Sequence, residues 1–252
     1  MSSIQCRNLS FSYGRHNRHV PVLNALDVDI PLGNLWAIVG PNGAGKSTFI
    51  KILAGILKPS RGSAHLGGVN EELLAYLPQH TDIDRNFPIS AYQMVAMGLW
   101  RFMGRSGGLT PELRARVYDA LDKVGLSGFG DRSIASLSGG QLQRILFARL
   151  LLQDASIILL DEPFNAIDNK TTADLVQLLH HWQAQGRTVI TVLHDLDQVK
   201  EQFPNTLMIA HRVIASGHTH DVLTPENLQK ARKACAEFDE NNLEKLHKAH
   251  AF

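Results

Sequence analysis

The feature that most constrains how this chain can fold is a glycine-rich loop between an apolar run and a segment of helical spacing. The loop matches G-x-x-x-x-G-K-[ST], and its residues are Gly40, Pro41, Asn42, Gly43, Ala44, Gly45, Lys46, Ser47 and Thr48. We expect a buried strand at 35–39 and a helix at 47–57. Glycine lets the backbone close around an anion, and a helix N-terminus presents free N–H groups to it. Strand, loop and helix in this order predict a site for the phosphates of a nucleotide.

Two side chains of this loop have specific expected roles. Lys46 should reach the β- and γ-phosphates, and the Ser47 hydroxyl should ligate Mg²⁺. The alternative is a glycine-rich turn that binds nothing. The flanking strand-like and helix-like segments favour the phosphate site over that alternative.

Composition and charge argue against several other classes of protein. The chain has 252 residues and a net charge of +1, so no strong field attracts it to nucleic acid or anionic lipid. Its two cysteines, Cys6 and Cys235, lie near opposite ends, which indicates a reducing compartment without a disulfide framework. We see no signal peptide and no apolar run near the ~18 residues that span a bilayer. We therefore expect a soluble, cytosolic protein whose membrane role, if any, depends on a partner.

Strand-like and helix-like segments alternate as they do in α/β folds. Residues 4–13 and 22–30 predict an N-terminal antiparallel β subdomain. Strand character returns at 157–160 and 188–193, with a helix between them at about 170–185. This alternation predicts a parallel sheet covered on both faces, followed by a hairpin at about 206–216.

The middle of the chain predicts helices broken by glycine. We expect one helix at 90–100, with Ser90 as a candidate cap, and another at 111–124, with Thr110 as N-cap. A third should begin at Ser138. We interpret residues of about 84–152 as a helical insert within one domain of residues 1–225. For the remaining tail, residues 226–252, the sequence leaves open a packed helix or a frayed end.

An apolar run that ends in two carboxylates follows the insert. In an open parallel sheet, ligands bind beyond the carboxyl ends of the strands, so Asp161 should lie beside Ser47 and hold Mg²⁺. Glu162 points differently and can polarise an attacking water as a general base. The alternative is that the two carboxylates cap a turn.

A second helix start resembles a phosphate-binding device. In Leu137-Ser138-Gly139-Gly140-Gln141, a serine N-cap and two glycines precede a helical segment whose free N–H groups point outward. Because the first loop already holds one triphosphate, this helix end is best explained as a contact to a nucleotide held by another copy. Taken alone, the segment also fits an ordinary helix start.

The three motifs, in this order and separation, resemble the nucleotide-binding subunit of an ABC transporter over about residues 4–225. The resemblance implies a P-loop NTPase core and further site residues. It implies that Tyr13 stacks on the adenine, that Gln79 senses Mg²⁺ and couples to the membrane subunit, and that His194 contacts the γ-phosphate. Singly, these residues also fit a half-buried strand aromatic, a turn residue and a core histidine.

The resemblance also implies a dimer and its partners. Ser138 and Gly140 would bind the γ-phosphate of the opposite subunit, and Asp168 would lie at the interface, although Asn165 and Ile167 depart from the usual Ser or Thr and Leu. It implies ATP and Mg²⁺ as cofactors and a head-to-tail homodimer. The expected partners are separate integral membrane permease subunits and, indirectly, a periplasmic or surface substrate-binding protein, with no nucleic acid. The expected location is the cytoplasmic face of the bacterial inner membrane.

The cargo is suggested by a shorter resemblance. Phe87-Pro88-Ile89, followed by Val95-Ala96-Met97-Gly98, is similar to zinc- and manganese-type uptake ATPases. Importers of iron chelates or vitamins remain an alternative, as does a soluble ABC ATPase that acts on DNA or ribosomes. The last usually carries two nucleotide domains or a long coiled-coil insertion, and this chain shows neither. A plain P-loop kinase or GTPase would leave the Ser138–Gln141 motif without a role.

Histidine pairs at the C-terminal end raise the possibility of a metal site. His218 and His220 could share one face of an extended strand, and His247 and His250 could share a helical face. Because no cysteine or carboxylate cluster completes a four-ligand zinc site, we interpret them as solvated surface residues.

Overall fold

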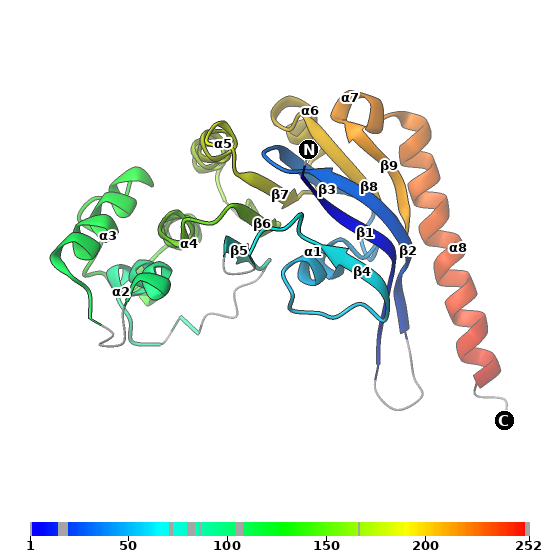
Figure 1. Ribbon diagram of the computed structural model, residues 1–252, viewed down its shortest axis with the longest axis horizontal. Helices are drawn as coiled ribbons and strands as arrows, with labels where there is room; N and C mark the ends of the chain where they lie inside the picture. The colour runs from blue at the N-terminus through cyan, green and yellow to red at the C-terminus, as the bar shows by residue number, and fades with distance from the viewer. Residues whose placement is uncertain are drawn as a thin grey trace.

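The computed structural model describes residues 2–14, 20–70, 73–79, 84–85, 87–103, 108–165 and 167–249, the side chains of 241–249 excepted. Within these residues the strands form two sheets (Figure 1). The smaller is antiparallel, in the order β2–β1–β4, and comprises β1 (Ser3–Tyr13), β2 (Val20–Pro31) and β4 (Arg61–His65). This agrees with the N-terminal antiparallel subdomain predicted from the sequence.

The larger sheet is parallel except at one edge. Its order is β5–β6–β7–β3–β8–β9, and only β9 runs antiparallel to its neighbour. The strands are β3 (Leu35–Val39), β5 (Leu74–Leu77), β6 (Ile157–Asp161), β7 (Thr188–Val192), β8 (Asn205–Ile209) and β9 (Val213–His218). Every residue of β3, β6 and β7 is buried, as their continuous apolar runs predict.

Helices cover the sheet and extend from one end of it. Figure 1 shows α2, α3 and α4 grouped at one end of the molecule and α8 lying along β9 at the other. The α-helices are α1 (Lys46–Leu53), α2 (Ala91–Ala96), α3 (Pro111–Lys123), α4 (Gly139–Gln153), α5 (Asn169–Ala184), α6 (Leu196–Gln202), α7 (Thr219–Val222) and α8 (Pro225–Ala249). The 3₁₀ helices among the described residues include η2 (Met97–Phe102) and η3 (Ile134–Ser136).

The larger sheet separates two apolar cores. On one face, Ile38 and Leu159 pack with Phe49 of α1 and with the antiparallel sheet. On the other face, Ala37 and Ile158 belong to the core that includes the residues of α4, α5 and α8. Because side chains alternate along a strand, each central strand contributes to both cores.

Several helix starts agree with the capping signals in the sequence. Ser90 and Ser138 each form a capping box with a glutamine three residues later, and the Thr110 hydroxyl accepts from the Leu113 N–H. These caps define where α2, α3 and α4 begin.

Two helix boundaries differ from the predictions. The first helix ends at Leu53 and not at 57, because Gly55 takes the left-handed conformation at φ 71°. The helix expected at 90–100 is α-helical only to Ala96 and continues as η2. The tail that the sequence left open is the long helix α8. In the part of the chain that the structure describes, no helix combines the length and apolar character needed to cross a membrane.

The packing of η2 on α4 gives a test of the helical insert. A Cβ at Gly98 would lie 2.3 Å from the Arg149 carbonyl oxygen and 2.9 Å from the Leu152 Cβ. We expect G98A to lower the free energy of unfolding by about 1–3 kcal/mol, because η2 must move off α4. Chemical denaturation of the purified protein measures this.

Gly108 supplies the matched control. A Cβ at Gly108 would meet nothing within 4 Å, so G108A should change stability by less than about 1 kcal/mol. Equal stabilities for the two variants would contradict the close packing of η2 on α4.

Candidate functional site

Four parallel strands end at the same edge of the larger sheet, and each is followed by a residue predicted to be functional. The glycine-rich loop follows β3, Gln79 follows β5, the Asp161-Glu162 pair ends β6, and His194 follows β7. The carboxyl edge of an open parallel sheet is where ligands bind. The fold therefore brings these sequence-predicted residues together.

The glycine-rich loop is packed tightly between β2 and the end of β8. A Cβ at Gly40 would lie 2.0 Å from the Ile209 carbonyl oxygen, and Gly45, the N-cap of α1, has φ 90°. Only glycine fits the first position, and the second favours it. The Lys46 Nζ donates to the carbonyl oxygens of Gly40 and Pro41 at 2.9 and 2.8 Å. Burial of Lys46, which is 5% exposed, lowers the pKa of its ammonium group.

Asp161 lies against the hydroxyl of Ser47, as the sequence predicted. The Ser47 Oγ donates to Asp161 Oδ1 at 2.9 Å. Asp161 is fully buried, and its Oδ2 has no hydrogen-bond partner among the described residues. Burial raises the pKa of this carboxyl group, an effect only partly offset by the bond from Ser47. An unpaired buried carboxylate oxygen beside a hydroxyl is a donor set of the kind that Mg²⁺ prefers.

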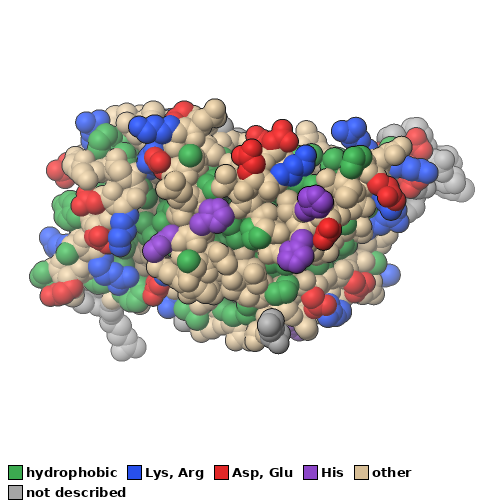
Figure 2. Space-filling model, turned by 90° about the horizontal axis from the view of Figure 1, so that it is seen from above, with side chains coloured by type: hydrophobic (Ala, Val, Ile, Leu, Met, Phe, Trp, Pro, Cys, Tyr) green, Lys and Arg blue, Asp and Glu red, His purple; other side chains and the backbone are tan. Residues whose placement is uncertain are grey.

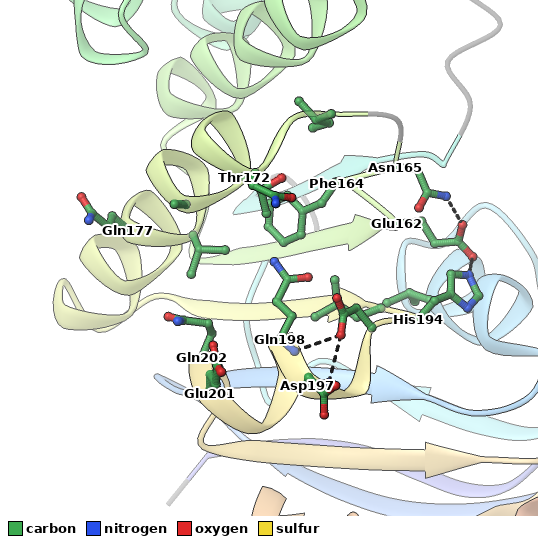
Figure 3. Close-up of a pocket in the computed structure, with 17 residues that line it drawn as sticks. Glu162, Phe164, Asn165, Thr172, Gln177, His194, Asp197, Gln198, Glu201 and Gln202 are labelled. Atoms are coloured by element: carbon green, nitrogen blue, oxygen red, sulfur yellow. Dashed lines mark hydrogen bonds and ion pairs between the residues drawn. The ribbon is translucent and has the colours of Figure 1, made fainter.

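Glu162 is held in a strained backbone conformation and by three side chains. Its φ is 51°, a left-handed value that is unusual for a residue with a Cβ. Its carboxylate contacts Gln79 Nε2, Asn165 Nδ2 and His194 Nε2. Figure 3 shows Asn165 and His194 pointing toward it from opposite sides. The Glu162 carboxylate therefore has partners different from that of Asp161, whose hydrogen bond is to Ser47.

The glycine-rich loop, Gln79, Glu162 and His194 line a cleft of about 440 Å³. A second cleft, of about 570 Å³, shares Glu162 and His194 but runs between α5 and α6 (Figure 3). Acidic side chains line the second cleft, among them Asp195, which caps α6 through the Asp197 and Gln198 N–H groups. Because the first contains the loop and its lysine, it is the one suited to phosphates.

Tyr13 lies at the rim of the loop. Its ring is 43% exposed, and its hydroxyl is 3.3 Å from Thr48 Oγ1. The ring makes an edge-to-face contact with Phe11 at 4.8 Å. An exposed aromatic face next to a phosphate loop is suited to stacking on a base. The same position also fits the alternative of a half-buried strand aromatic, because Tyr13 ends β1 and packs on Phe11.

The Ser138-Gly139-Gly140 helix tip is not among the residues that line either cleft. It packs instead on the segment before α5: a Cβ at Gly140 would lie 3.2 Å from the Ile167 side chain and 3.6 Å from Asp168 Oδ2. Asp168 caps α5, accepting from the Thr171 N–H and hydroxyl at 2.8 Å each, and these bonds lower the pKa of its carboxyl group. One chain therefore does not bring this tip to its own glycine-rich loop.

Three residues near the site were not identified from the sequence. The bond from Asn165 to Glu162 was missed because Asn165 was considered only as a departure from a motif. Val22 lines the phosphate cleft from β2, and no local pattern marks it. Tyr76 has a buried hydroxyl without a partner among the described residues, and its pKa is raised first by burial and then by the charge of Asp161. Only the three-dimensional fold places these side chains here.

Of the four histidines considered for a metal site, the structure describes the side chains of His218 and His220. Figure 2 shows histidines spread over one face, some of them beside acidic side chains. His218 and His220 are exposed, but β9 ends at His218 and α7 begins at Thr219, so the two do not share a strand. No group of three or more His, Cys, Asp or Glu side chains suited to a metal occurs among the described residues. The side chains of His247 and His250, and the segments 80–83 and Asn86, lie outside them.

Comparisons with known proteins identify the family. The family described as ABC transporter matches residues 23–165, more than half of the chain. The zinc transport system ATP-binding protein TroB of Treponema pallidum is 38% identical over 256 residues, which cover 99% of this chain and 95% of that one. The manganese transport system ATP-binding protein MntB of Bacillus subtilis is 38% identical over 91% of this chain and 92% of its own.

Solved structures agree with these relatives. A metal-chelate type ABC transporter in an inward-facing conformation superposes with a TM-score of 0.79 and 30% identity, covering 92% of this chain and 90% of that one. The dimeric ATP-binding cassette MJ0796, bound to ADP and Pi after hydrolysis, has a TM-score of 0.74 and 25% identity over 86% of this chain and 98% of that one. The α/β fold, the phosphate loop and these similarities together show that the chain belongs to the ABC transporter family, as an ATPase subunit.

Proposed function

We propose that this chain is the ATP-hydrolysing motor of an importer of a divalent metal, zinc or manganese. The observation that carries the hydrolytic part is the convergence of Lys46, Asp161, Glu162 and His194 at one edge of the sheet. The curated relatives, which are named as zinc and manganese transport proteins, support the cargo. We do not assign a binding site for the transported metal to this chain.

The reaction assigned to the cleft is in-line transfer of the γ-phosphoryl group of ATP to water. The P-loop N–H groups and the Lys46 ammonium offset the negative charge that the transferring group carries. Glu162 accepts a proton from the attacking water and orients it, while His194 steadies both the carboxylate and the γ-phosphate. Tyr13 stacks on the adenine. Most of the rate acceleration then comes from positioning and charge compensation.

Mg²⁺ is assigned to Ser47, Gln79 and Asp161. All three offer oxygen atoms, and the unpaired Oδ2 of Asp161 supports the assignment. When bound, the ion compensates phosphate charge and orients the β- and γ-phosphates.

The helix tip of α4 supports a homodimer. Because Ser138, Gly139 and Gly140 do not line the cleft of their own chain, we assign them to the γ-phosphate of a nucleotide bound by a second copy. Asp168, which packs near the same tip, is assigned to the interface between the copies. The dimeric cassette among the solved structures supports this arrangement.

The membrane partner is assigned to the helical insert. Exposed aromatic and apolar side chains gather in the part of the chain from β5 to α3: Phe87, Met97, Trp100, Phe102 and Tyr118. Trp100 is 76% exposed, which is costly unless a partner covers it. We assign this surface to the integral membrane permease subunits at the cytoplasmic face of the bacterial inner membrane. A periplasmic or surface substrate-binding protein would supply the cargo from the other side.

Replacing Glu162 tests the mechanism. E162Q keeps the size of the side chain and removes its ability to accept a proton, so kcat should fall by about 10²-fold or more. ATP binding should persist because the P-loop is unchanged, and size-exclusion chromatography with ATP should show an increased dimer fraction. Glu201 in the neighbouring acidic cleft is the matched control, and E201Q should hydrolyse ATP at the wild-type rate. Wild-type turnover in E162Q would overturn the role of Glu162.

We expect the buried carboxylate of Asp161 to lower the stability of the fold while it provides a ligand for Mg²⁺. Because burial disfavours its charged form, D161N should unfold about 2–4 °C higher than wild type at pH 7 without nucleotide, as about 1 kcal/mol produces in a chain of this size. The same variant should lose the Mg²⁺-dependent part of its ATP affinity. Calorimetry and nucleotide titration measure the two effects, with the exposed Asp119→Asn as control. A lower unfolding temperature for D161N would contradict the cost assigned to this buried charge.

Uptake assays test the cargo. In a strain that lacks this chain, accumulation of radioactive zinc or manganese should fall and should return when the wild-type chain is supplied. E162Q should fail to restore it. If instead only uptake of an iron chelate or a vitamin depended on the chain, the metal assignment would be wrong and the alternative importer would replace it. The alternative of a chelate importer has a counterpart among the similar solved structures, one of which is a metal-chelate type transporter.

A further inference from the structure

His211, in the turn between β8 and β9, lies directly behind the P-loop. Its N–H donates to the Ala44 carbonyl oxygen at 3.0 Å, and its own carbonyl oxygen accepts from the Asn24 N–H at 2.8 Å. Its imidazole Nδ1 donates to the Val22 carbonyl oxygen at 2.9 Å. His211 thus hydrogen-bonds to Ala44 of the P-loop and to two residues of β2, Val22 and Asn24.

The conformation of His211 is one that needs external support. The residue is 7% exposed and has φ 59°, in the left-handed region that residues with a Cβ rarely occupy. Its ring stacks on Phe238 of α8, with ring centroids 3.7 Å apart and planes within 8° of parallel. The helix that carries Phe238 is fixed in turn by Ala231, Ala234 and Cys235, which are buried in the larger core. The C-terminal helix therefore holds the His211 ring in place.

The P-loop has little freedom where His211 contacts it. Ala44 is fully buried, a Cβ at Gly40 would overlap the Ile209 carbonyl group, and a Cβ at Gly45 would lie 2.5 Å from Leu23 Cδ2. Val22 and Ala44, the two residues that His211 ties together, both line the nucleotide cleft. A small shift of His211 would therefore move the walls of that cleft.

We propose that His211 is a positioning residue for nucleotide binding and that Phe238 holds it, so that the helix α8 sets the affinity of the P-loop for nucleotide. The proposal rests on the assignment of this cleft to ATP. A preorganised loop binds its ligand more tightly because less ordering is lost on binding. The effect acts on bound substrate and transition state alike, so it should change KM and leave kcat nearly unchanged.

The test compares three variants of the full chain. F238A removes the stack, F238Y keeps it, and H211N removes the imidazole while keeping a residue that tolerates the left-handed conformation. We expect F238A and H211N to raise the Kd of a fluorescent ATP analogue and the KM for ATP by about fivefold or more, with kcat within about twofold of wild type. F238Y should restore both values. If F238A fails to fold, H211N carries the test.

Leu228 of α8 gives the matched control, because it packs against the larger core away from His211. L228A should lower the unfolding temperature and leave the Kd unchanged. Wild-type Kd values for both F238A and H211N, or an equal rise in Kd for L228A, would overturn the proposal by showing that α8 only stabilises the fold. Failure of the nucleotide assignment is distinguishable, since K46A would then bind the analogue as tightly as wild type does.

Discussion

The site depends on burying three charged groups at one edge of the sheet. Lys46 is 5% exposed, Asp161 is fully buried and Glu162 is 8% exposed. Removing such charges from water costs several kcal/mol each unless hydrogen bonds and opposite charges compensate. Glu162 receives three contacts, but Asp161 Oδ2 has none among the described residues, so the compensation is uneven. The sheet and the two cores must supply the stability that this edge does not.

The parallel sheet makes this uneven compensation of the buried charges possible. β3, β6 and β7 are adjacent or separated by one strand and are buried at every position, so their ends are fixed relative to one another. Alternation along β6 directs Asp161 to the face of α1, where Ser47 lies. The left-handed turn at Glu162 then directs the next carboxylate toward His194. This backbone turn thus separates the carboxylate of Asp161, proposed for Mg²⁺, from that of Glu162, proposed for the attacking water.

Sequence patterns correctly predicted those features that are determined by residues close together in the chain. The P-loop, the N-caps at Ser90 and Ser138 and the strand that ends in Asp161 were all predicted from short segments, because propensity and spacing determine them. The end of α1 was predicted too late, since Ile56 continues the apolar spacing but is 56% exposed beyond the turn at Gly55. The contacts of Asn165 with Glu162 and of His211 with Phe238 could not be predicted, because nothing in their local sequence marks side chains that meet only when the chain is folded.

The P-loop and the Ser138 helix tip of one chain are held by different parts of the fold. The P-loop is anchored to β2, to the end of β8 and, by the proposal above, to α8. The Ser138 helix tip, in contrast, packs against Ile167 and Asp168, just before α5. A nucleotide held between two copies, as proposed, would therefore contact the P-loop of one copy and the α4 tip of the other. As proposed, hydrolysis would change the charge between the two copies at an edge that the larger core reaches through Ala44 and Leu193.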